Sequence, residues 1–468
     1  MAQMIPLEDY VARVLEAIVP LASTRVALGE AHGRILAEDV SAAVPVPPWT
    51  NSAMDGYAVR AAETSGASAQ APVVLPVAGD VPAGAAPIPL APGSAQRIMT
   101  GAMLPEGADA VVKVEDTDQA PGPHPLPERV EIRAAAREGL NVRRAGENVR
   151  AGDSVMAAGT RLSAAAVSAL ASVGLGSVPV AARARVAVVS TGAELRDAGE
   201  SLAPGAIPDS NGLLLAGLVS EHDADCVSVA RSGDSAEELA AVLRRAAAGA
   251  DLIVTSGGVS AGAFDPLTML AHADQHEGAP VHLDFVKVAM QPGKPQGHGW
   301  VRADDGRRVP IICLPGNPVS VLVSFTTIVA PALARLADVD SCLPDLPGRP
   351  TLTARAAAAW LTPPGRRQHV PVRFTEPPTE PAAGSGVDAG DRIGAPSGPD
   401  AAPDAGVSWV TPTHRLGSGS HLVASLPAAQ ALAVVAAEVE SVEVGDELPL
   451  IPLTGSCPSG RPVRVDAP

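Results

Sequence analysis

Aromatic residues and cysteines are scarce in this sequence. Its 468 residues include 2 tyrosines and 4 phenylalanines, although 46% of all residues are hydrophobic. We therefore expect cores built mainly from alanine, valine and leucine. The 4 cysteines form no CxxC pair, and we interpret them as reduced, structural thiols of a cytosolic protein. They are Cys226, Cys313, Cys342 and Cys457.

The sequence shows no pattern typical of a secretory signal or of a membrane-spanning helix. The first residues, MAQMIPLEDY, contain no basic segment followed by an apolar one, so we expect no secretory signal. No run reaches the roughly 18 apolar residues that a membrane-spanning helix requires. We predict a cytoplasmic protein that has no membrane partner.

Basic residues are outnumbered by acidic ones. The chain has 34 Lys and Arg residues against 51 Asp and Glu residues, which gives a net charge of −17. Nucleic acids and anionic membranes bind to concentrated basic faces, so the composition disfavours both as partners. If the ligand is an anion, local lysines, backbone amides or a bound cation must attract it.

A chain of this length is expected to form several domains. Apolar residues recur at helical spacing in 7–18 and 163–174, whereas 73–133 shows short alternating runs broken by Gly and Pro. We predict a multidomain α/β plus β protein with a central doubly wound parallel sheet. Its domains are residues 1–60 with 140–182 (a discontinuous helical scaffold), 61–139 (an inserted small β domain), 183–340 (the α/β domain) and 345–455 (a C-terminal β domain). Residues 377–407, dominated by Pro, Ala, Gly and Asp, are predicted to be a disordered loop in the last domain.

Three segments of the α/β domain share one pattern. RVAVVSTGAEL, DLIVTSGGVSAG and VPIICLPGNPVS are each an apolar strand, a glycine-bearing turn and a helix start. In a parallel sheet such turns emerge at the carboxyl ends of the strands, where ligands bind and where exposed amides can hold phosphate. One turn alone is as often a plain tight turn, but three on one sheet edge favour a binding site. The pattern is neither GxGxxG nor GxxxxGK[ST], so neither nucleotide fingerprint applies.

Carboxylates stand beside these turns. Asp265 closes SGGVSAGAFD, Glu194 follows VVSTG, and Asp209 begins DSN. Asp265 could simply cap the next helix. Acids beside a bound anion repel it unless a hard cation bridges them, and Mg²⁺ takes carboxylate, phosphate and water oxygens. We therefore predict that the acids hold a metal and that the metal holds the anion.

Other polar residues near these turns have weaker patterns. Lys287 and Lys294, in FVKVAMQPGKPQGHGW, supply local positive charge, whereas we interpret His298 as a surface or capping residue. Asp55 in PPWTNSAMDGYAVR and Thr100 in RIMTGAMLPEGADAVV lie on predicted turns, where spacing alone leaves a catalytic role and an ordinary loop both open. Nothing resembles a Ser/His/Asp triad, an HExxH motif or a cysteine nucleophile.

Seven motifs occur in the order found in one known family. They are NSAMDGYAVR, RIMTGAMLPEGADAVVKVEDT, STGAEL, DSN, SGGVSAGAFD, QPGKP and LPGNPVS. Together they resemble the molybdopterin molybdenumtransferases, which include the carboxy-terminal domain of gephyrin, over nearly the whole chain. The resemblance implies a four-domain homodimer whose active sites are shared between chains, with molybdopterin adenylyltransferase as an upstream partner. It implies an enzyme that inserts molybdenum from molybdate into adenylylated molybdopterin and releases AMP, with Mg²⁺ present.

The resemblance also assigns roles to individual residues. Asp55, Thr100, Glu194 and Asp265 match catalytic positions, and Glu194 and Asp265 would in addition hold the metal. The positions that match cofactor-binding residues lie mostly in the three glycine turns and in the lysine-bearing segment. They are Ser190, Thr191, Gly192, Asp209, Asn211, Ser256, Gly257, Gly258, Ser260, Gly262, Lys287, Lys294, Pro315, Gly316, Asn317 and Pro318.

Two positions depart from the family pattern. Asn148 in RRAGENV stands where an acid is common, and Gln291 in VAMQPGKP stands where a lysine is common. We interpret the two changes as compensating, because one negative and one positive charge are lost together. The alternative is a catalytically weakened, gephyrin-like scaffold paralogue that holds a protein partner. A generic nucleotide-dependent phosphotransferase is disfavoured by the missing P-loop.

Overall fold

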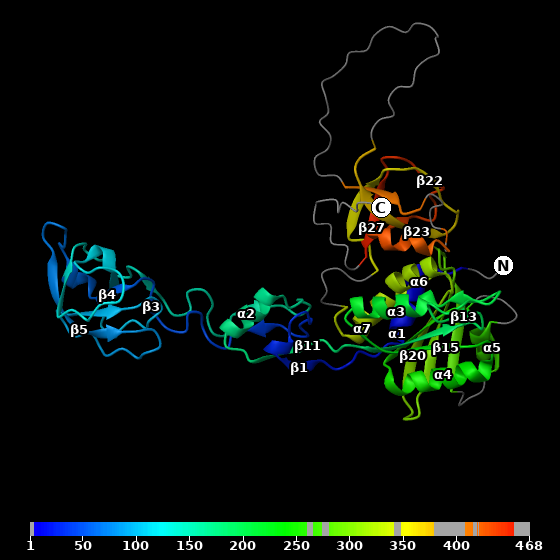
Figure 1. The fold of residues 1–468 in the computed structure, drawn as a ribbon, viewed down its shortest axis with the longest axis horizontal. Coiled ribbons are helices and arrows are strands. Elements are labelled where there is room, and N and C mark those ends of the chain that lie inside the picture. The colour runs from blue at the N-terminus through cyan, green and yellow to red at the C-terminus, as the bar shows by residue number, and fades with distance from the viewer. Residues whose placement is uncertain are drawn as a thin grey trace, which may run out of the picture. The chain divides into compact units, whose positions relative to one another are not determined.

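The computed structural model describes residues 4–259, 265–273, 280–340, 348–378, 408–414, 419 and 421–453. The chain forms two compact units (Figure 1). One unit is Thr24–Val180, and the other joins Met1–Ser23 to Ala181–Pro468. The predicted disordered loop 377–407 lies outside the described residues except for its first two positions.

A six-stranded sheet forms the centre of the second unit, in the order β15-β12-β16-β20-β19-β17. The first four strands are parallel, as predicted, whereas β19 pairs antiparallel with both β20 and β17. The lysine-bearing segment therefore belongs to an antiparallel extension that the sequence pattern did not predict. The strands are β12 (Arg185–Thr191), β15 (Asp225–Ser232), β16 (Leu252–Ser256), β17 (Val281–Lys287), β19 (Pro295–Arg302) and β20 (Arg308–Leu314).

Helices cover both faces of this sheet (Figure 1). Successive residues of a strand point to opposite faces, so Val186 and Val188 of β12 enter one core while Ala187 and Val189 enter the other. The first core also contains residues of α1, α3, α6 and α7, and the second contains residues of α4 and α5. The helices are α1 (Leu7–Glu16), α3 (Ser210–Glu221), α4 (Ala236–Gly249), α5 (Pro266–Ala273), α6 (Pro318–Ser324) and α7 (Ala330–Leu336).

Helix α1 packs on the α/β core, whereas the sequence pattern assigned residues 1–60 to the helical scaffold. Its buried residues Leu7, Tyr10 and Val14 belong to the core of the central sheet. The chain before the helix is also tied to the sheet, because the amide of Ile5 donates to the carbonyl of Lys287 at 2.9 Å. An amphipathic helix packs on whichever core its apolar stripe reaches, and helical spacing does not reveal which core that is.

One continuous helical stretch, Pro318–Leu336, is long and apolar enough to cross a membrane by length and composition. The sequence analysis found no such run because serine, threonine and proline interrupt it. In the structure 89% of the most apolar part of this stretch is buried inside the protein. It consists of α6, a π-helical turn (Phe325–Val329) and α7, and it forms the centre of the core on one face of the sheet.

The C-terminal part is a small β barrel, in agreement with the predicted C-terminal β domain. The pairings of β23, β24, β21, β27 and β25 close on themselves, because β25 also pairs with β23. Strand β18 (Met290–Gln291) of the preceding part pairs with β23 and joins the two parts. The barrel strands are β21 (Leu352–Ala356), β23 (Arg367–Thr375), β24 (Trp409–Pro412), β25 (Ala431–Val435) and β27 (Glu447–Pro452), with the short pair β22 (Trp360–Leu361) and β26 (Ser441–Val442) and the helical turn η5 (Val423–Ala428).

The unit Thr24–Val180 is mostly β structure, with one α-helix, α2 (Ala164–Ser172). Its main sheet has the order β7-β4-β6-β5-β8, so β4 lies inside the small β domain although it precedes residue 61. Helix α2 confirms the helix predicted over residues 163–174, but the rest of 24–60 and 140–180 forms mainly short strand pairs rather than the predicted helical scaffold. The strands are β1 (Thr24–Ala27), β2 (Val40–Ser41), β3 (Asn51–Ser52), β4 (Gly56–Val59), β5 (Val73–Val81), β6 (Ala95–Ile98), β7 (Ala110–Lys113), β8 (Arg129–Ile132), β9 (Val142–Arg143), β10 (Ser154–Met156) and β11 (Ser177–Val180).

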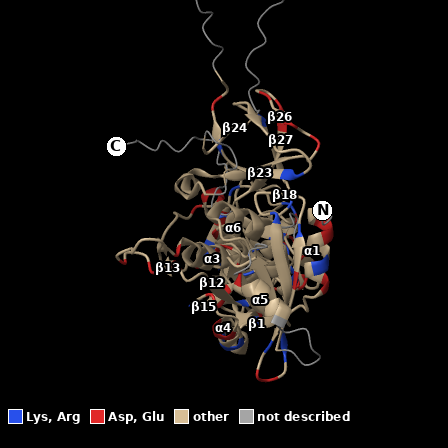
Figure 2. Ribbon diagram, turned by 90° about the vertical axis from the view of Figure 1, so that its right-hand side faces the viewer, with Lys and Arg blue, Asp and Glu red and all other residues tan. Residues whose placement is uncertain are grey.

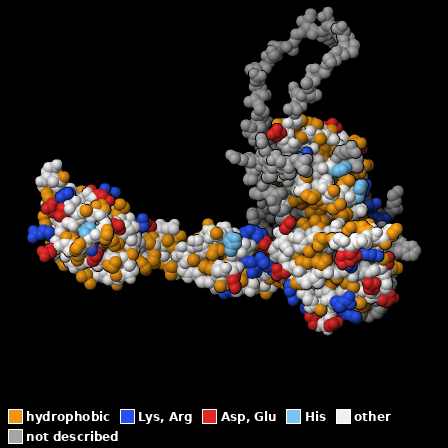
Figure 3. Space-filling model, in the orientation of Figure 1, with side chains coloured by type: hydrophobic (Ala, Val, Ile, Leu, Met, Phe, Trp, Pro, Cys, Tyr) orange, Lys and Arg blue, Asp and Glu red, His pale blue; other side chains and the backbone are white. Residues whose placement is uncertain are grey.

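Charged side chains are dispersed over the surface. Figure 2 shows acidic and basic residues together on α1 and α4, whereas α6 carries neither. On the face shown in Figure 3, basic side chains are interspersed with acidic ones over the α/β part.

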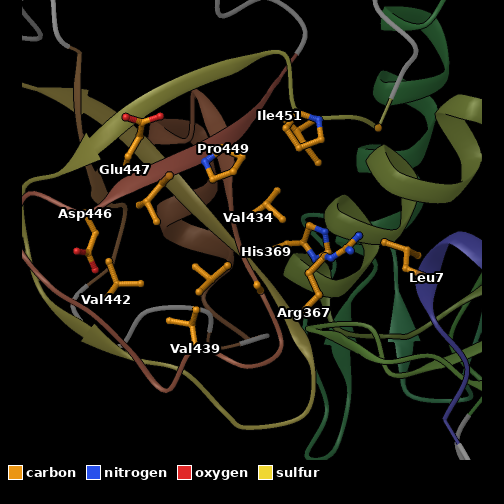
Figure 4. A pocket seen from close by; sticks show the side chains of 15 residues that line it. Leu7, Arg367, His369, Val434, Val439, Val442, Asp446, Glu447, Pro449 and Ile451 are labelled. Atoms are coloured by element: carbon orange, nitrogen blue, oxygen red, sulfur yellow. The ribbon is translucent and has the colours of Figure 1, made fainter.

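A group of polar side chains, of which His369 is buried, lies between α1 and the barrel. Figure 4 shows Arg367 and His369 next to each other, on the side of a cavity toward Leu7. Arg367 forms an ion pair with Glu8 of α1. His369 is 1% exposed, and this burial lowers the pKa of its imidazole to about 4, with help from the positive charge of Arg367.

His369 is expected to make the protein less stable in acid. Because its folded pKa lies below the unfolded value of about 6.5, the stability that its neutral form supports is present above pH 6.5 and is lost as the pH falls toward 4. Lowering the pH from 7 to 5 should cost about 2 kcal/mol of unfolding free energy through this residue. Urea titrations should show that His369→Gln loses about that much less than the wild type, while a variant of the exposed His282 (His282→Gln) behaves like the wild type. Equal losses in all three proteins would contradict this assignment.

Candidate functional site

A cavity of about 560 Å³ lies at the carboxyl ends of the parallel strands. The turns after β12, β16 and β20 form it together with the start of α3, as the sequence pattern predicted for the three glycine turns. The predicted site residues that line it are Thr191, Gly192, Glu194, Asp209, Asn211, Ser256, Gly257, Gly258, Asp265, Pro315, Gly316, Asn317 and Pro318.

Glycine is required in the second turn because two backbones approach each other there. Gly257 and Gly258 have φ angles of +91° and +67°, in the left-handed region. A Cβ on Gly257 would lie 2.6 Å from the carbonyl oxygen of Thr191, in the first turn. The absence of a side chain at Gly257 therefore allows the first and second turns, which both line the cavity, to approach each other.

Gly257→Ala is expected to lower the free energy of unfolding by about 2 to 3 kcal/mol, from backbone strain and the clash with Thr191. Gly316→Ala is a matched control in the same cavity. Its Cβ would meet no atom nearer than the Cα of Gly257 at 3.5 Å, so a loss below about 1 kcal/mol is expected. Chemical denaturation of both variants measures this difference. If the two lost equal stability, the close approach would not be what requires glycine at position 257.

Two amides in these turns are already used inside the protein. The amide of Gly192 donates to the carbonyl of Ser232 at 3.1 Å, and that of Gly257 donates to the carbonyl of Leu314 at 3.0 Å. These two N–H groups therefore differ from the sequence-based expectation, which had the amides of the glycine turns exposed to a phosphate. Any anion in the cavity must be held mainly by other groups.

The cavity is acidic. Glu194, Asp209, Asp234 and Asp265 line it, and no lysine or arginine is among the described residues that do so. Asp209 accepts from the amide of Gly212 at 2.9 Å and thereby caps α3, and Asp234 accepts from the amide of Ala193 at 3.0 Å. Two of the four carboxylates therefore support the local fold, while Glu194 and Asp265 are the two that the sequence assigned to a metal.

Two side chains in this cavity carry buried polar atoms that lack a hydrogen-bond partner. They are the Oδ2 atom of Asp265 and the Oδ1 atom of Asn211. The amide group of Asn211 donates to the carbonyl of Gly316 at 2.6 Å, which fixes the side chain between the start of α3 and the third turn. Buried polar atoms normally have partners, so these two are exceptions that an ion, a ligand or a water would explain.

The carboxylates of this cavity fit a hard cation that is bound partly by the protein and partly by the substrate of the protein. Among the described residues, no group of three or more His, Cys, Asp and Glu side chains is arranged to hold a metal. Mg²⁺ does not need one, because it is commonly bound by one or two carboxylates together with substrate phosphates and water. The unpartnered oxygen of Asp265 is a suitable ligand of this kind, and Glu194 lines the same cavity.

The predicted lysines lie outside the lining of this cavity. Lys287 ends β17 and is exposed, and the half-buried Lys294 lies in the turn before β19. Lys294 is followed by Pro295, which does line the cavity. Both lysines belong to the antiparallel extension of the sheet, and neither lines the cavity.

Asp55 and Thr100 form a separate cluster in the unit Thr24–Val180. The Oδ1 atom of Asp55 accepts from the amide of Thr100 at 2.6 Å and from its hydroxyl at 2.7 Å. These two hydrogen bonds lower the pKa of the exposed Asp55 carboxyl, so it is ionised at neutral pH. The cluster forms because β4, which follows Asp55, pairs with β6, which precedes Thr100.

Comparisons with known proteins agree with this arrangement. Residues 5–174 match the MoeA N-terminal region (domain I and II), and residues 187–335 match a probable molybdopterin binding domain. The chain is 45% identical over 362 residues to molybdopterin molybdenumtransferase 2 of Mycobacterium tuberculosis, which covers 77% of this chain and 85% of the relative. It is 39% identical to the molybdopterin molybdenumtransferase of a Nostoc species over 66% of this chain and 68% of the relative. The chain belongs to the molybdopterin molybdenumtransferase family.

A solved structure agrees with this family assignment. The molybdopterin biosynthesis moea protein from Pyrococcus horikosii has a TM-score of 0.74 to this chain, with 29% identity, over 96% of this chain and 99% of that one. The multidomain α/β plus β architecture predicted from the sequence is thereby confirmed.

Besides Lys287 and Lys294, three of the cofactor-binding positions assigned by resemblance are not among the described residues that line the cavity. Ser190 is fully buried in β12, just before the first turn in the sequence. Ser260 and Gly262 lie outside the described residues. The assignment of these residues, and of those that do line the cavity, to cofactor binding or catalysis stays a prediction.

The sequence analysis did not predict Asp234, which lines the cavity, or the partner of Gln291, which is Arg366. Asp234 lies in SGDS after β15, which is a fourth glycine-bearing turn at the same sheet edge. Arg366 donates to the Oε1 atom of Gln291 at 2.6 Å. An arginine from the barrel therefore supplies positive charge next to Gln291.

Proposed function

We propose that this chain is a transferase of molybdenum cofactor biosynthesis that uses molybdate and adenylylated molybdopterin. It inserts molybdenum into the dithiolene of the pterin, and the phosphoanhydride is cleaved with release of AMP. The family membership supports the reaction class. The observation that carries the assignment of the site is the acidic cavity at the strand ends, with its unpartnered Asp265 oxygen.

Charge decides how a phosphorylated substrate can enter this cavity. Phosphate oxygens next to Glu194 and Asp265 would be repelled, so a divalent cation must accompany them. Mg²⁺ bound by these two residues would stabilise the charge that develops on the phosphoanhydride oxygens. The side chain of Asn211, fixed by Gly316, would accept a hydrogen bond from the substrate through its unpartnered oxygen.

We also propose a homodimer in which the Asp55–Thr100 cluster and the acidic cavity contribute to shared active sites. The support is that both sets of residues match functional positions of one family while they reside in separate compact units. Molybdopterin adenylyltransferase is proposed as the upstream partner, because an enzyme that adenylylates molybdopterin must supply this substrate.

The test is AMP release from adenylylated molybdopterin by the purified protein, measured with and without molybdate and Mg²⁺. We expect release that requires both ions. A protein that binds the substrate without releasing AMP would support the alternative of a gephyrin-like scaffold paralogue, for which Asn148 and Gln291 would be the first positions to restore.

A further inference from the structure

An apolar groove of about 360 Å³ lies between α3, α6 and the end of the barrel. The proposed reaction gives it no role, although its volume is in the range of spaces that take a small ligand or a few side chains. Its apolar side chains come from α3, from α6, from η5 and from the chain that follows β27. They include Leu214, Leu218, Leu322, Val423, Leu426 and Leu453.

The groove follows α3 and adjoins the acidic cavity. The residues of α3 that line it are spaced so that they share one face of the helix, and they are Ser210, Leu214, Leu218 and Glu221. They span the whole helix, a distance of about 17 Å at a rise of about 1.5 Å per residue. At the beginning of α3, Ser210 and Pro318 line both the groove and the acidic cavity. An occupant of the groove would therefore lie beside the proposed active site.

Both ends of the groove are negatively charged. Glu221 lines it at the end of α3, and the carboxylates of the acidic cavity lie next to its other end, at Ser210. No lysine or arginine is among the described residues that line either space. An occupant that combines apolar side chains with positive charge would complement this pattern.

The chain itself continues from this groove. Leu453 lines the groove and is the last residue that the structure describes. Its amide donates to the carbonyl of Gln430 at 3.1 Å, which holds the chain at this place. The residues that follow, 454–468, have the sequence TGSCPSGRPVRVDAP. They contain two arginines and one acidic residue, whereas the whole chain has 34 basic and 51 acidic residues.

This segment is long enough to follow the groove along all of α3. An extended chain spans at most about 3.6 Å per residue, so the eight residues 454–461 reach up to about 29 Å. Alternate side chains of an extended segment point to the same side, so Val463 and Val465 would face the groove together. We propose that residues 454–468, the C-terminal segment, dock in this groove, with the valines against the leucines of α3 and the arginines toward its acidic ends. Bound there, the C-terminal segment places positive charge beside the acidic cavity.

The test is whether the C-terminal segment competes with a free copy of itself. A fluorescein-labelled peptide of residues 454–468 is titrated onto the full-length protein and onto a full-length segment variant with Val463→Asp and Val465→Asp, and fluorescence anisotropy gives Kd. In the wild type the tethered segment competes at an effective concentration in the millimolar range. The segment variant leaves the groove open, so the peptide should bind it at least about tenfold more tightly than the wild type.

Substitutions in α3 locate the binding site. Leu214→Ser, added to the segment variant, should weaken peptide binding about tenfold, because this side chain lines the groove. Leu213→Ser is the matched control, since Leu213 is the preceding residue, is 66% exposed and is not among the residues that line the groove. It should leave Kd unchanged. A peptide with Arg461→Gln and Arg464→Gln should bind more weakly than the native peptide, and high salt should remove this difference.

Three results would overturn the inference. They are no peptide binding to the segment variant, equal Kd for the segment variant and the wild type, and equal effects of Leu213→Ser and Leu214→Ser. Self-association of the protein that requires Leu214, without peptide binding, would assign the groove to a second copy and refute the proposal as well. If Leu214→Ser failed to fold, a peptide with Val463→Asp and Val465→Asp would decide, because equal binding of that peptide and the native one contradicts docking of the valines. None of these measurements depends on AMP release, so the outcome is independent of the proposed reaction.

Discussion

Asp265→Asn is expected to lower the rate of molybdate-dependent AMP release by at least about 100-fold, a typical loss for a positioned electrostatic group. The substitution keeps the size of the side chain and removes its negative charge, so a cation at the sheet edge would lose a ligand. The backbone should be unaffected, because the carbonyl of Asp265 still accepts from the amide of Met269 in α5. Steady-state kinetics with varied Mg²⁺ would separate a lower kcat from weaker metal binding.

Asp234→Asn is the matched control for that variant. Asp234 lines the same cavity, but its Oδ1 atom already accepts from the amide of Ala193, and an asparagine retains an oxygen there. We expect the rate of AMP release to fall less than about tenfold, because this variant makes the cavity less negative but removes no proposed metal ligand. Near-normal turnover in Asp265→Asn, or equal losses in the two variants, would refute the assignment of Asp265 to the metal.

Mixing Asp55→Ala chains with Asp265→Ala chains is expected to restore about a quarter of wild-type activity, although each variant is inactive alone. In the proposed dimer each active site takes Asp55 from one chain and Asp265 from the other. A mixed dimer then has one site with both substitutions and one site with neither. Random exchange makes half of the dimers mixed, and each has one intact site of two.

The complementation experiment needs proof that the subunits exchange. Differently tagged chains and native mass spectrometry would measure the mixed fraction. Asp55→Ala mixed with separately tagged Asp55→Ala should stay inactive. If mixed dimers were present and no activity returned, each site would be built within one chain, and the proposed sharing would be wrong.

The sequence predicted those parts of the site whose pattern is local. The strands β12, β16 and β20 are apolar runs, each followed by a glycine-bearing turn. The sequence alone therefore indicated that the three turns lie at the same edge of one sheet. Helix α4 begins at a local capping signal, because the hydroxyl of Ser235 accepts from the amide of Glu238 at 3.3 Å. In each case the residues that determine the structure are adjacent in the sequence.

Parts that depend on distant residues could not be predicted. Asp234 follows β15, an edge strand in which Val227 and Val229 are exposed, so the strand lacks the apolar run that marked the other three. The hydrogen bond between Arg366 and Gln291 joins residues 75 positions apart through the pairing of β18 with β23. The local sequence pattern does not reveal which residues of two distant strands pair. The partner of Gln291 could therefore be identified only from the structure.

The central claim is that the protein couples cleavage of adenylylated molybdopterin to insertion of molybdenum. The direct measurement is the ratio of molybdenum bound in the pterin product to AMP released, with metal determined by mass spectrometry and AMP by chromatography of the same sample. The account predicts one molybdenum inserted for each AMP released, and little AMP when molybdate is withheld. AMP formed at the same rate without molybdate, or with no metal in the product, would show a simple hydrolase and contradict the account.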